Sequence, residues 1–423
     1  MLKQGLAMLA TLTATAAIFA APPAGAAVSS SELKGTLTIA DWELLENGHG
    51  PQIKALFTEY EKTHPGVRLK FEGVSYDSYV PTIEAQIGAH SGPDLMVLED
   101  SSFYDLLRAH VLAPITGLPA ADLNALRPQN NQAMSDGHRY GLIWETVIYD
   151  SIYNKSLFNK AGITTAPKTF SEFLSDCQAI KAKTGAWGYA ARNTINEEDA
   201  WYDDFTATWI DGYGGNWTDA TGKFTINSPQ NIAAVSDFAK VYKSGCMDTG
   251  EIAAVFRAKY EHGQVGILMD NADAAFTYTY DNPVVTNQDQ GVASLPMPAK
   301  YSGDQQLFFT INKYSKNAAL ANDFLAWLYD PATQQKVVAA TAPQTSGSTT
   351  PLPPDFVKTH PWVEPYEHQV DNGESLLVQK RPWLTLKLAS ILMPYIERVL
   401  QGQLTAKEAL DQAQSAAVSQ LGN

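Results

Sequence analysis

Hydrophobic and polar positions along the chain follow two alternating periods. TLTIA and VRLKFEGV have the pattern of strands, and between them Ile53, Leu56, Phe57 and Tyr60 recur at the spacing of one helical face. YVPTIEAQIGAH then predicts a helix, DLMVL a buried strand, and residues 103–110 another helix. This alternation predicts a largely parallel sheet with helices on both faces.

The same alternation continues to the C-terminus. Ser228 followed by Pro229 predicts a capped helix start, and VGILM predicts another buried strand. TAKE (residues 405–408) is a capping box that predicts the start of a C-terminal helix. Residues 341–354 contain Ser, Thr, Gly and Pro and predict a linker or loop.

Length and charge limit the possible classes of protein. The chain has 423 residues, which favours two to three structural units. Its formal net charge of −15 argues against a nucleic-acid partner and against an anionic membrane surface, because both require a basic face.

The N-terminus has the pattern of a secretory signal. Lys3 precedes an apolar stretch of small residues, and PAGAA offers a cleavage site after Ala26, so residues 1–26 are predicted to be a cleaved signal peptide. No Cys lies near that site, which argues against a lipid anchor. The mature chain is therefore predicted to be exported to the periplasm as a soluble protein.

Cys177 and Cys246 are the two cysteines of the chain, and the sequence leaves two interpretations open. An oxidising compartment permits them to form a disulfide. Alternatively, Cys177 is a small core residue, because it continues the helical stripe of Phe170, Phe173 and Leu174.

No catalytic or metal-binding motif is present in the sequence. EEDAWYDD (residues 197–204) crowds five carboxylates, so a secreted glycosidase using two of Asp199, Asp203, Asp204 and Glu99 is an alternative function from a different class. Acidic clusters on loops are more often solvated or ligand-binding than catalytic.

Acids, amides and tryptophans follow four of the apolar strands. In open α/β sheets, ligands bind beyond the carboxyl ends of the strands. Carboxylates accept hydrogen bonds from hydroxyl groups, and Trp rings cover the apolar faces of a sugar, so the clusters predict a neutral polyhydroxyl ligand. The clusters contain Asp41, Trp42 and Glu43; Glu99 and Asp100; Trp144 and Glu145; and Asp270, Asn271 and Asp273.

Six segments give the chain a resemblance to a known family. They are FTEYEKTHPGVRLKFEGV, AHSGPDLMVLED, IYNKSLFNKAGITTAPKTFSEF, YEHGQVGILMDNADAAF, FFTINKYSKNAALANDFLAWL and RPWLTLKLASILMPYIERVLQGQLTAKEALDQAQ. In this order the chain resembles the extracellular solute-binding proteins of ATP-binding-cassette (ABC) importers, of the carbohydrate type that includes maltose and trehalose binders. The resemblance covers nearly the whole mature chain.

The resemblance implies an α/β fold, the two-lobed periplasmic-binding-protein fold of type II. Each lobe would be a mostly parallel sheet flanked by helices, and hinge strands would join the lobes around a ligand cleft. Lobe one would comprise residues 34–113 plus 301–345, and lobe two residues 114–300 plus 346–423. VLAPIT, VASLPMPA and the Ser-Gly-Thr-Pro stretch would be the three crossings.

The resemblance also implies ligand-binding positions. Glu99 matches an acid that bonds sugar hydroxyls, and Arg381 matches an arginine that can reach the sugar in trehalose-type members. The Trp that many relatives carry near Asp270, Asn271 and Asp273 is missing, so Trp42, Trp201 or Trp209 should stack on the ligand. Relatives often have Gly-Gly where this chain has Gln305 and Gln306, and Gln306 is included among the candidate residues.

The resemblance implies that the protein is the substrate-binding component of an ABC sugar importer. It would bind a mono- or oligosaccharide as a monomer, without a cofactor or a metal, and deliver it to the permease. A polyamine or another cationic small molecule is the alternative ligand, because acids and Trp suit a cation. Tyr149 and Tyr153 give a faint indication of ferric ion. We expect Trp144→Ala or Glu99→Ala to weaken binding with little loss of stability.

Overall fold

The computed structural model describes residues 33–46, 48, 50–341, 347–370 and 373–422. The expected signal peptide (1–26) and residues 342–346 of the predicted loop lie outside the described residues. Within the described part, no helix combines the length and the apolar character that crossing a membrane requires.

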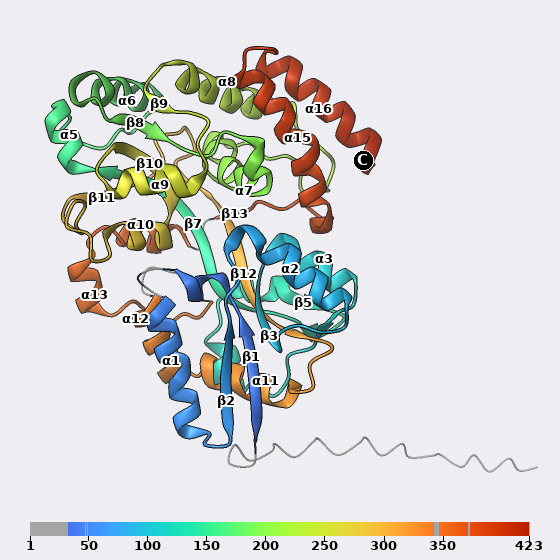
Figure 1. Ribbon diagram of the computed structural model, residues 1–423. Helices are drawn as coiled ribbons and strands as arrows, with labels where there is room; N and C mark the ends of the chain where they lie inside the picture. Colours follow the sequence, from blue (N-terminus) through green and yellow to red (C-terminus); the bar gives the residue numbers. More distant parts are fainter. Residues whose placement is uncertain (1–32, 47, 49, 342–346, 371–372, 423) are drawn as a thin grey trace, which may run out of the picture.

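The chain forms two lobes (Figure 1). Lobe one, below in this view, contains β1 (Gly35–Ala40), the 3-10 turn Trp42–Leu45, α1 (Gly50–Thr63), β2 (Val67–Glu72), α2 (Tyr76–Gly88), β3 (Leu95–Glu99), α3 (Asp100–Arg108), β4 (Leu112–Ala113), α4 (Ala120–Asn124), the 3-10 turn Pro128–Ala133, β5 (Met134–Ser135), β6 (His138–Arg139), α11 (Ala318–Tyr329) and α12 (Pro331–Thr341).

Lobe two lies above lobe one in Figure 1. It contains α5 (Lys155–Ala161), α6 (Phe170–Thr184), β8 (Trp187–Ala190), the 3-10 turn Ile195–Glu197, α7 (Glu198–Phe205), the π-helical turn Thr206–Ile210, the 3-10 turn Asp211–Tyr213, α8 (Pro229–Lys243), β9 (Met247–Asp248), α9 (Ala253–Glu261), β10 (Val265–Asn271), α10 (Ala272–Thr279), β11 (Gln290–Ala293), α13 (Pro354–Thr359), α14 (Glu364–Gln369), β13 (Glu374–Ser375), the 3-10 turn Pro382–Leu384, α15 (Thr385–Leu400) and α16 (Ala406–Leu421).

Two long strands, β7 (Leu142–Asn154) and β12 (Gly303–Asn312), carry the chain between the lobes. Among the described residues, eleven strands form one connected sheet with the order β2-β1-β3-β12-β7-β10-β8-β9, and β4, β11 and β13 pair at its sides. The first half of β7 pairs with β12, and its second half pairs with β10 and β11. The predicted α/β class with two lobes is therefore confirmed.

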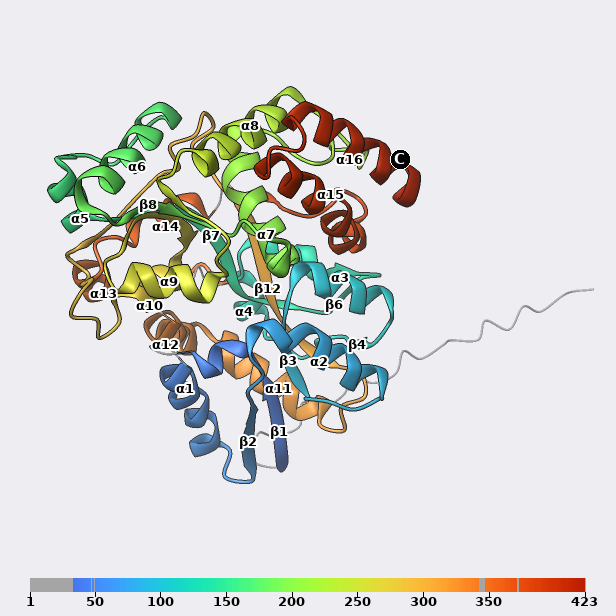
Figure 2. The ribbon, with the colours of Figure 1, turned by 45° about the horizontal axis from the view of Figure 1, so that its top comes forward.

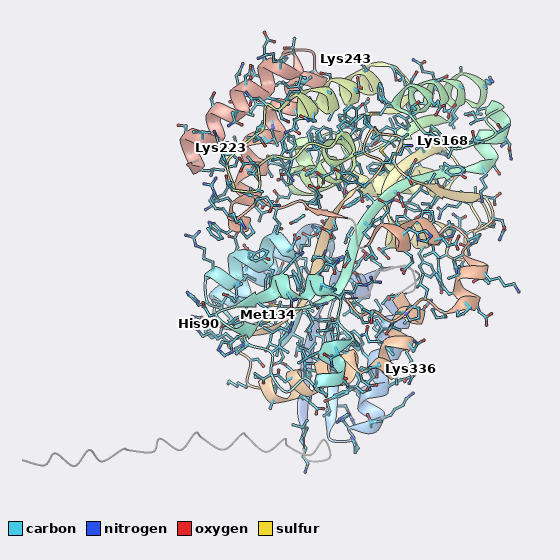
Figure 3. All side chains as sticks on the ribbon, turned by 180° about the vertical axis from the view of Figure 1, so that it is seen from behind. His90, Met134, Lys168, Lys223, Lys243 and Lys336 are labelled. Atoms are coloured by element: carbon cyan, nitrogen blue, oxygen red, sulfur yellow. A yellow bond between two sulfur atoms is a disulfide. The ribbon has the colours of Figure 1, made fainter. Side chains whose placement is uncertain are left out.

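The structure places the first two crossings between the lobes later than the sequence predicted. Residues 114–141 belong with lobe one, because Ile115 and Ala133 are part of its core and Ile115 pairs with Arg139. Figure 3, seen from behind, labels Met134 in the same lobe as His90 and Lys336. The first two crossings between the lobes are therefore the strands β7 and β12, not the loops VLAPIT and VASLPMPA. The pairing of these two strands continues across both lobes.

The third crossing follows Ser348. Ser348 pairs with Leu126 in lobe one, and the carbonyl of Gly347 accepts a hydrogen bond from Arg127 N over 2.8 Å. Leu352 then packs against the part of the lobe-two core that contains Trp362. This crossing lies within the Ser-Gly-Thr-Pro stretch.

Several local signals in the sequence act as predicted. Ser228 caps α8 by accepting a hydrogen bond from Asn231 N, and Thr405 and Glu408 form a complete capping box at α16. Cys177 and Cys246 form a disulfide with 5.6 Å between their Cα atoms, and both side chains are also buried in the core of lobe two. The two interpretations of Cys177, a disulfide partner and a core residue, therefore both apply.

Candidate functional site

A cavity of about 250 Å³ lies between the lobes, and residues from both lobes and from both crossing strands line it. Figure 2 shows α7 of lobe two facing α2 and α3 of lobe one. The lining residues are Trp42, Glu43, Glu46, Tyr76, Glu99, Glu145, Val147, Tyr149, Arg192, Glu197, Ala200, Asp203, Asp204, Ile252, Ala253, Ala254, Arg257, Asn271, Asp273, Gln305 and Leu307.

The alternation of strand side chains decides which residues of β7 and β12 reach this cavity. Successive side chains on a strand point to opposite faces. Glu145 and Tyr149 therefore share the cavity side of β7, whereas Trp144 lies on the opposite side. On β12, Gln305 lines the cavity and Gln306 does not.

Trp42 supplies the aromatic wall of the cavity from lobe one. Strand β1 ends just before Asp41, whose Oδ1 accepts a hydrogen bond from Glu43 N over 3.0 Å and thereby caps the turn that contains Trp42. The Trp42 ring packs edge-on against Tyr76 and Tyr79, with ring centroids 5.5 Å and 4.9 Å apart. The two tyrosine rings thus hold the Trp42 ring in place at the cavity wall.

Glu99 is the last residue of β3, and its carboxylate faces the cavity from lobe one. The hydroxyl of Tyr76 donates a hydrogen bond to Glu99 Oε1 over 2.8 Å. Burial raises the pKa of the Glu99 carboxyl, and the Tyr76 hydrogen bond and the charge of Arg192 only partly oppose that shift.

Asp203 and Asp204 on α7 bring carboxylates from lobe two. The side-chain amide of Gln305 donates to Asp203 Oδ2 over 3.1 Å. Burial is the main cause that raises the pKa of the Asp203 carboxyl well above its usual value, and the nearby negative charge of Glu99 raises it further. Asp204 instead forms an ion pair with Arg192, whose Nε also lies 3.6 Å from Glu197 Oε1.

Asp270, Asn271 and Asp273 have different positions at the end of β10. Asp270 lies behind the cavity wall, where Arg257 donates to both of its oxygens over 3.0 Å and 2.8 Å and the Tyr278 hydroxyl donates over 2.6 Å. Asn271 caps α10 and also lines the cavity, as does Asp273. Asp270 therefore positions Arg257 rather than facing a ligand.

Asp100 and Gln306 also lie behind the wall. Asp100 is buried and its Oδ2 accepts a hydrogen bond from the backbone N of Gln306 over 3.2 Å. The side chain of Gln306 accepts from Thr146 Oγ1 and donates to Asp304. The prediction that these two residues contact a ligand is therefore corrected to a supporting position.

Trp144, Trp201 and Trp209 are core residues and do not line the cavity. Trp144 is 3% exposed and lies in the core of lobe one, although its Nε1–H donates to Glu43 Oε2 over 2.8 Å. Trp201 and Trp209 are each 1% exposed in the core of lobe two, because they lie on the inward faces of their helical turns. Of the three tryptophans proposed for stacking, the structure brings Trp42 alone to the described cavity wall.

Arg381 also lies away from the cavity. Its guanidinium donates to the carbonyls of Gly222, Leu421 and Gly422 and lies over the Phe224 ring, 5.0 Å from the centroid. It therefore fastens the end of α16 to lobe two, and the ligand role implied by the resemblance is corrected.

Three charged or aromatic residues, Tyr76, Arg192 and Arg257, are among the residues of the cavity wall that the sequence interpretation missed. Tyr76 is the first residue of α2, while Arg192 follows β8 and Arg257 lies on α9. None belongs to an acidic cluster at the end of a strand, which is the pattern that predicted Glu99, Asn271 and Asp273. Among the described residues, no group of three or more His, Cys, Asp or Glu side chains is placed to hold a metal ion.

A second hollow of about 680 Å³ lies beside the cavity. Both hollows are lined by Trp42, Tyr76 and Glu99, so they adjoin each other. The outer part adds Ile195 and Leu386, among other residues. A ligand longer than one ring can therefore extend outward from the inner cavity.

Comparisons with known proteins agree with this geometry. The model of the family described as "Bacterial extracellular solute-binding protein" matches residues 46–335. A putative binding protein of Brucella abortus is 26% identical over 292 residues, which are 65% of this chain and 68% of that protein. A probable ABC transporter-binding protein of Deinococcus radiodurans is 25% identical over 303 residues, with the same coverage of 65% and 68%.

Solved structures share the fold. The GacH receptor of Streptomyces glaucescens, whose structures were determined without ligand and with acarbose, superposes with a TM-score of 0.78 at 22% sequence identity. The match covers 92% of this chain and 98% of the receptor. The two-lobed arrangement is therefore that of a known structural class.

Proposed function

The chain belongs to the bacterial extracellular solute-binding protein family, and we propose that it is the saccharide-binding component of an ABC importer. The observation that carries the proposal is the cavity between the lobes, whose wall combines the ring of Trp42 with the carboxylates of Glu99 and Asp203. An indole ring covers the apolar face of a sugar, and carboxylates accept hydrogen bonds from its hydroxyl groups. The acarbose complex of the GacH receptor, which shares the fold, supports a saccharide ligand.

The mechanism is a change in the angle between the lobes. A ligand in the cavity contacts Trp42 and Glu99 of lobe one and Asp203 of lobe two at the same time, so it binds the closed form best. Shifting the equilibrium from 1:99 to 99:1 requires roughly 5.5 kcal/mol of preference for the closed form. Several buried hydrogen bonds and one ring contact are enough to supply this difference.

The partner in this proposal is an importer permease in the membrane. The Deinococcus radiodurans relative is described as an ABC transporter-binding protein, which supports this assignment. The protein would reach the permease as an exported monomer after cleavage of residues 1–26, without a lipid anchor. Its net charge of −15 disfavours a nucleic-acid partner.

We propose that the site binds without catalysis. The matched family and the relatives above are described as binding proteins rather than enzymes. Incubation with maltose, trehalose and cellobiose should therefore release no new reducing ends. Steady hydrolysis of an oligosaccharide that is lost in Asp203→Asn would support the glycosidase alternative.

The test of the function is a thermal-shift screen of the mature protein against mono- and oligosaccharides, followed by calorimetric titration. We expect at least one saccharide to raise the melting temperature and to reduce the radius of gyration in small-angle scattering. Trp42→Ala should weaken that binding. Failure of every saccharide to bind would reject the proposal, and binding without compaction would reject the closure mechanism.

A further inference from the structure

We propose that the solute is a saccharide carrying a protonated amine, which lies between the carboxylates of Glu99 and Asp203. This inference rests on the proposed function and specifies the chemical class of its solute. It depends on the charges of the cavity wall and on which of them the protein already neutralises.

The wall of the inner cavity carries a large excess of acid. Among its described residues it contains eight carboxyl groups and two guanidinium groups. The acids are Glu43, Glu46, Glu99, Glu145, Glu197, Asp203, Asp204 and Asp273, and the bases are Arg192 and Arg257. Neutral hydroxyl groups need acceptors, but they do not need this imbalance of charge.

Both guanidinium groups are already engaged with other carboxylates. Arg192 is paired with Asp204 and lies beside Glu197. Arg257 donates two hydrogen bonds to Asp270, which lies behind the wall. The two bases therefore hold lobe two together, and the acids that engage them are Asp204, Glu197 and Asp270.

Glu99 and Asp203 differ from Asp204 and Asp270, which pair with arginines. The hydrogen bonds described above that Glu99 and Asp203 accept come from uncharged donors. The donor to Glu99 is the Tyr76 hydroxyl, and the donor to Asp203 is the Gln305 amide. Asp203 is 8% exposed, so its charge has little access to solvent. These two acids are thus the best placed to receive a cation from the ligand.

The two acids come from opposite lobes and repel each other. Burial and the charge of Glu99 both disfavour the ionised form of Asp203, and they raise its pKa. Closing the lobes brings these like charges together in a site with little water, where the repulsion is strong. An ammonium group between them removes the repulsion, so such a ligand favours the closed form more than a neutral one does.

The remaining wall suits a sugar ring rather than a simple polyamine. The Trp42 ring offers an apolar face, and it also attracts a cation that lies close to it. Asn271 and Gln305 add amide groups that can bond hydroxyls. The outer hollow extends the site beyond one ring.

The test compares matched pairs of sugars by calorimetric titration at pH 6, where a sugar amine is protonated. The pairs are glucose with glucosamine, galactose with galactosamine, and cellobiose with the glucosamine dimer chitobiose; spermidine is the cation without a ring. We expect the aminated member of at least one pair to bind tenfold tighter or more. That preference should fall in Glu99→Gln and Asp203→Asn, and it should persist in Asp355→Asn, a surface substitution on α13 with the same change of charge.

The outcomes separate this inference from the proposed function. Equal affinity for both members of every pair that binds would overturn the inference and leave the saccharide function standing. Spermidine binding as tightly as the aminated sugars would overturn it as well, because the ring would then contribute nothing. An aminated preference that survives in both Glu99→Gln and Asp203→Asn would reject the assigned position, and circular dichroism checks that these variants are folded.

Discussion

Trp144 donates its indole N–H to Oε2 of Glu43 over 2.8 Å, although 101 positions separate them in the sequence. The indole ring belongs to the core of lobe one, with ring centroids 5.9 Å from Phe57 and 5.0 Å from Phe309. Glu43 belongs to the cavity wall. A core side chain on a crossing strand therefore orients an acid of the cavity wall.

Trp144→Phe should weaken both stability and binding. Phenylalanine keeps an aromatic ring but removes the donor, so the buried Glu43 oxygen loses its indole partner at a cost of about 1–3 kcal/mol. Chemical denaturation measures the stability, and calorimetry measures a several-fold loss of affinity. Trp209→Phe is the matched control: it loses the bond from its Nε1 to Tyr189 in the core of lobe two and should lower stability alone.

The position of Trp144 also corrects our expectation that Trp144→Ala would leave the fold nearly unchanged. A tryptophan that is 3% exposed leaves a large cavity when truncated, and the expected loss of stability is about 3–5 kcal/mol. Glu99→Ala remains the cleaner test of binding, because Glu99 lines the cavity.

Tyr76→Phe should weaken ligand binding while preserving the aromatic wall. The substitution keeps the ring against Trp42 and removes the hydroxyl that donates to Glu99. We expect a loss of affinity of about three- to tenfold, which corresponds to the roughly 0.5–1.5 kcal/mol that one typical hydrogen bond contributes. Tyr60→Phe is the control, because Tyr60 makes the same type of bond to Asp323 away from the cavity. Equal effects of the two variants on affinity would contradict this role of Tyr76.

The sequence predicted the elements and the acidic strand ends well, since both are local properties. The strand ends at Glu99 and at Asn271 each follow from a short pattern, and both residues line the cavity. The boundary between the lobes was harder to predict from the sequence, because no local signal distinguishes a 13-residue strand that belongs to both lobes from a strand within one lobe.

The sequence also did not reveal on which face of a strand each side chain lies. Trp144 and Glu145 are adjacent, and strand geometry sends one into the core and the other into the cavity. A run in which nearly every residue is buried shows no alternation that would reveal this. Tyr76 and Arg257 reach the site only through tertiary packing, so the sequence offered no signal for them.

Asp304 should make the stability depend on pH. Burial, and to a smaller extent the negative charge of Glu374, raises the pKa of the Asp304 carboxyl from 3.8 to about 6. The folded state therefore holds a proton that the unfolded state has released, so this stabilisation is complete below about pH 4 and is lost as the pH rises through about 6. The difference in unfolding free energy between the wild type and Asp304→Asn should fall by on the order of 2 kcal/mol from pH 4 to pH 7. Unfolding free energies that change with pH by the same amount in the wild type and in Asp304→Asn would contradict this role of Asp304.

Loss of the disulfide should destabilise lobe two and leave the cavity intact. Cys177 and Cys246 close a loop across 69 positions, and removal of a native disulfide typically costs 2–5 kcal/mol. The variant Cys177→Ser/Cys246→Ser should therefore unfold at lower denaturant concentration but bind the ligand normally at 20 °C. Changed affinity in the folded variant would show that the disulfide also positions α7.

Arg108→Ala should shift the lobes toward the open form without touching the cavity. Arg108, exposed on α3 of lobe one, lies over the ring of Trp383 of lobe two, 4.9 Å from its centroid. Because the contact joins the two lobes, it stabilises the closed form, and an exposed cation–π contact contributes about 0.5–1 kcal/mol. The expected result is a two- to fivefold loss of affinity, together with a larger radius of gyration at subsaturating ligand.

The control for Arg108→Ala is Lys181→Ala, which removes a cation–π contact of the same kind with Trp187 inside lobe two. That contact is the same in the open and closed forms, so its loss should change neither affinity nor the radius of gyration. If Arg108→Ala left both quantities unchanged as well, the contact between α3 and Trp383 would not contribute to closure. The equilibrium would then depend on the ligand and the crossing strands β7 and β12 alone.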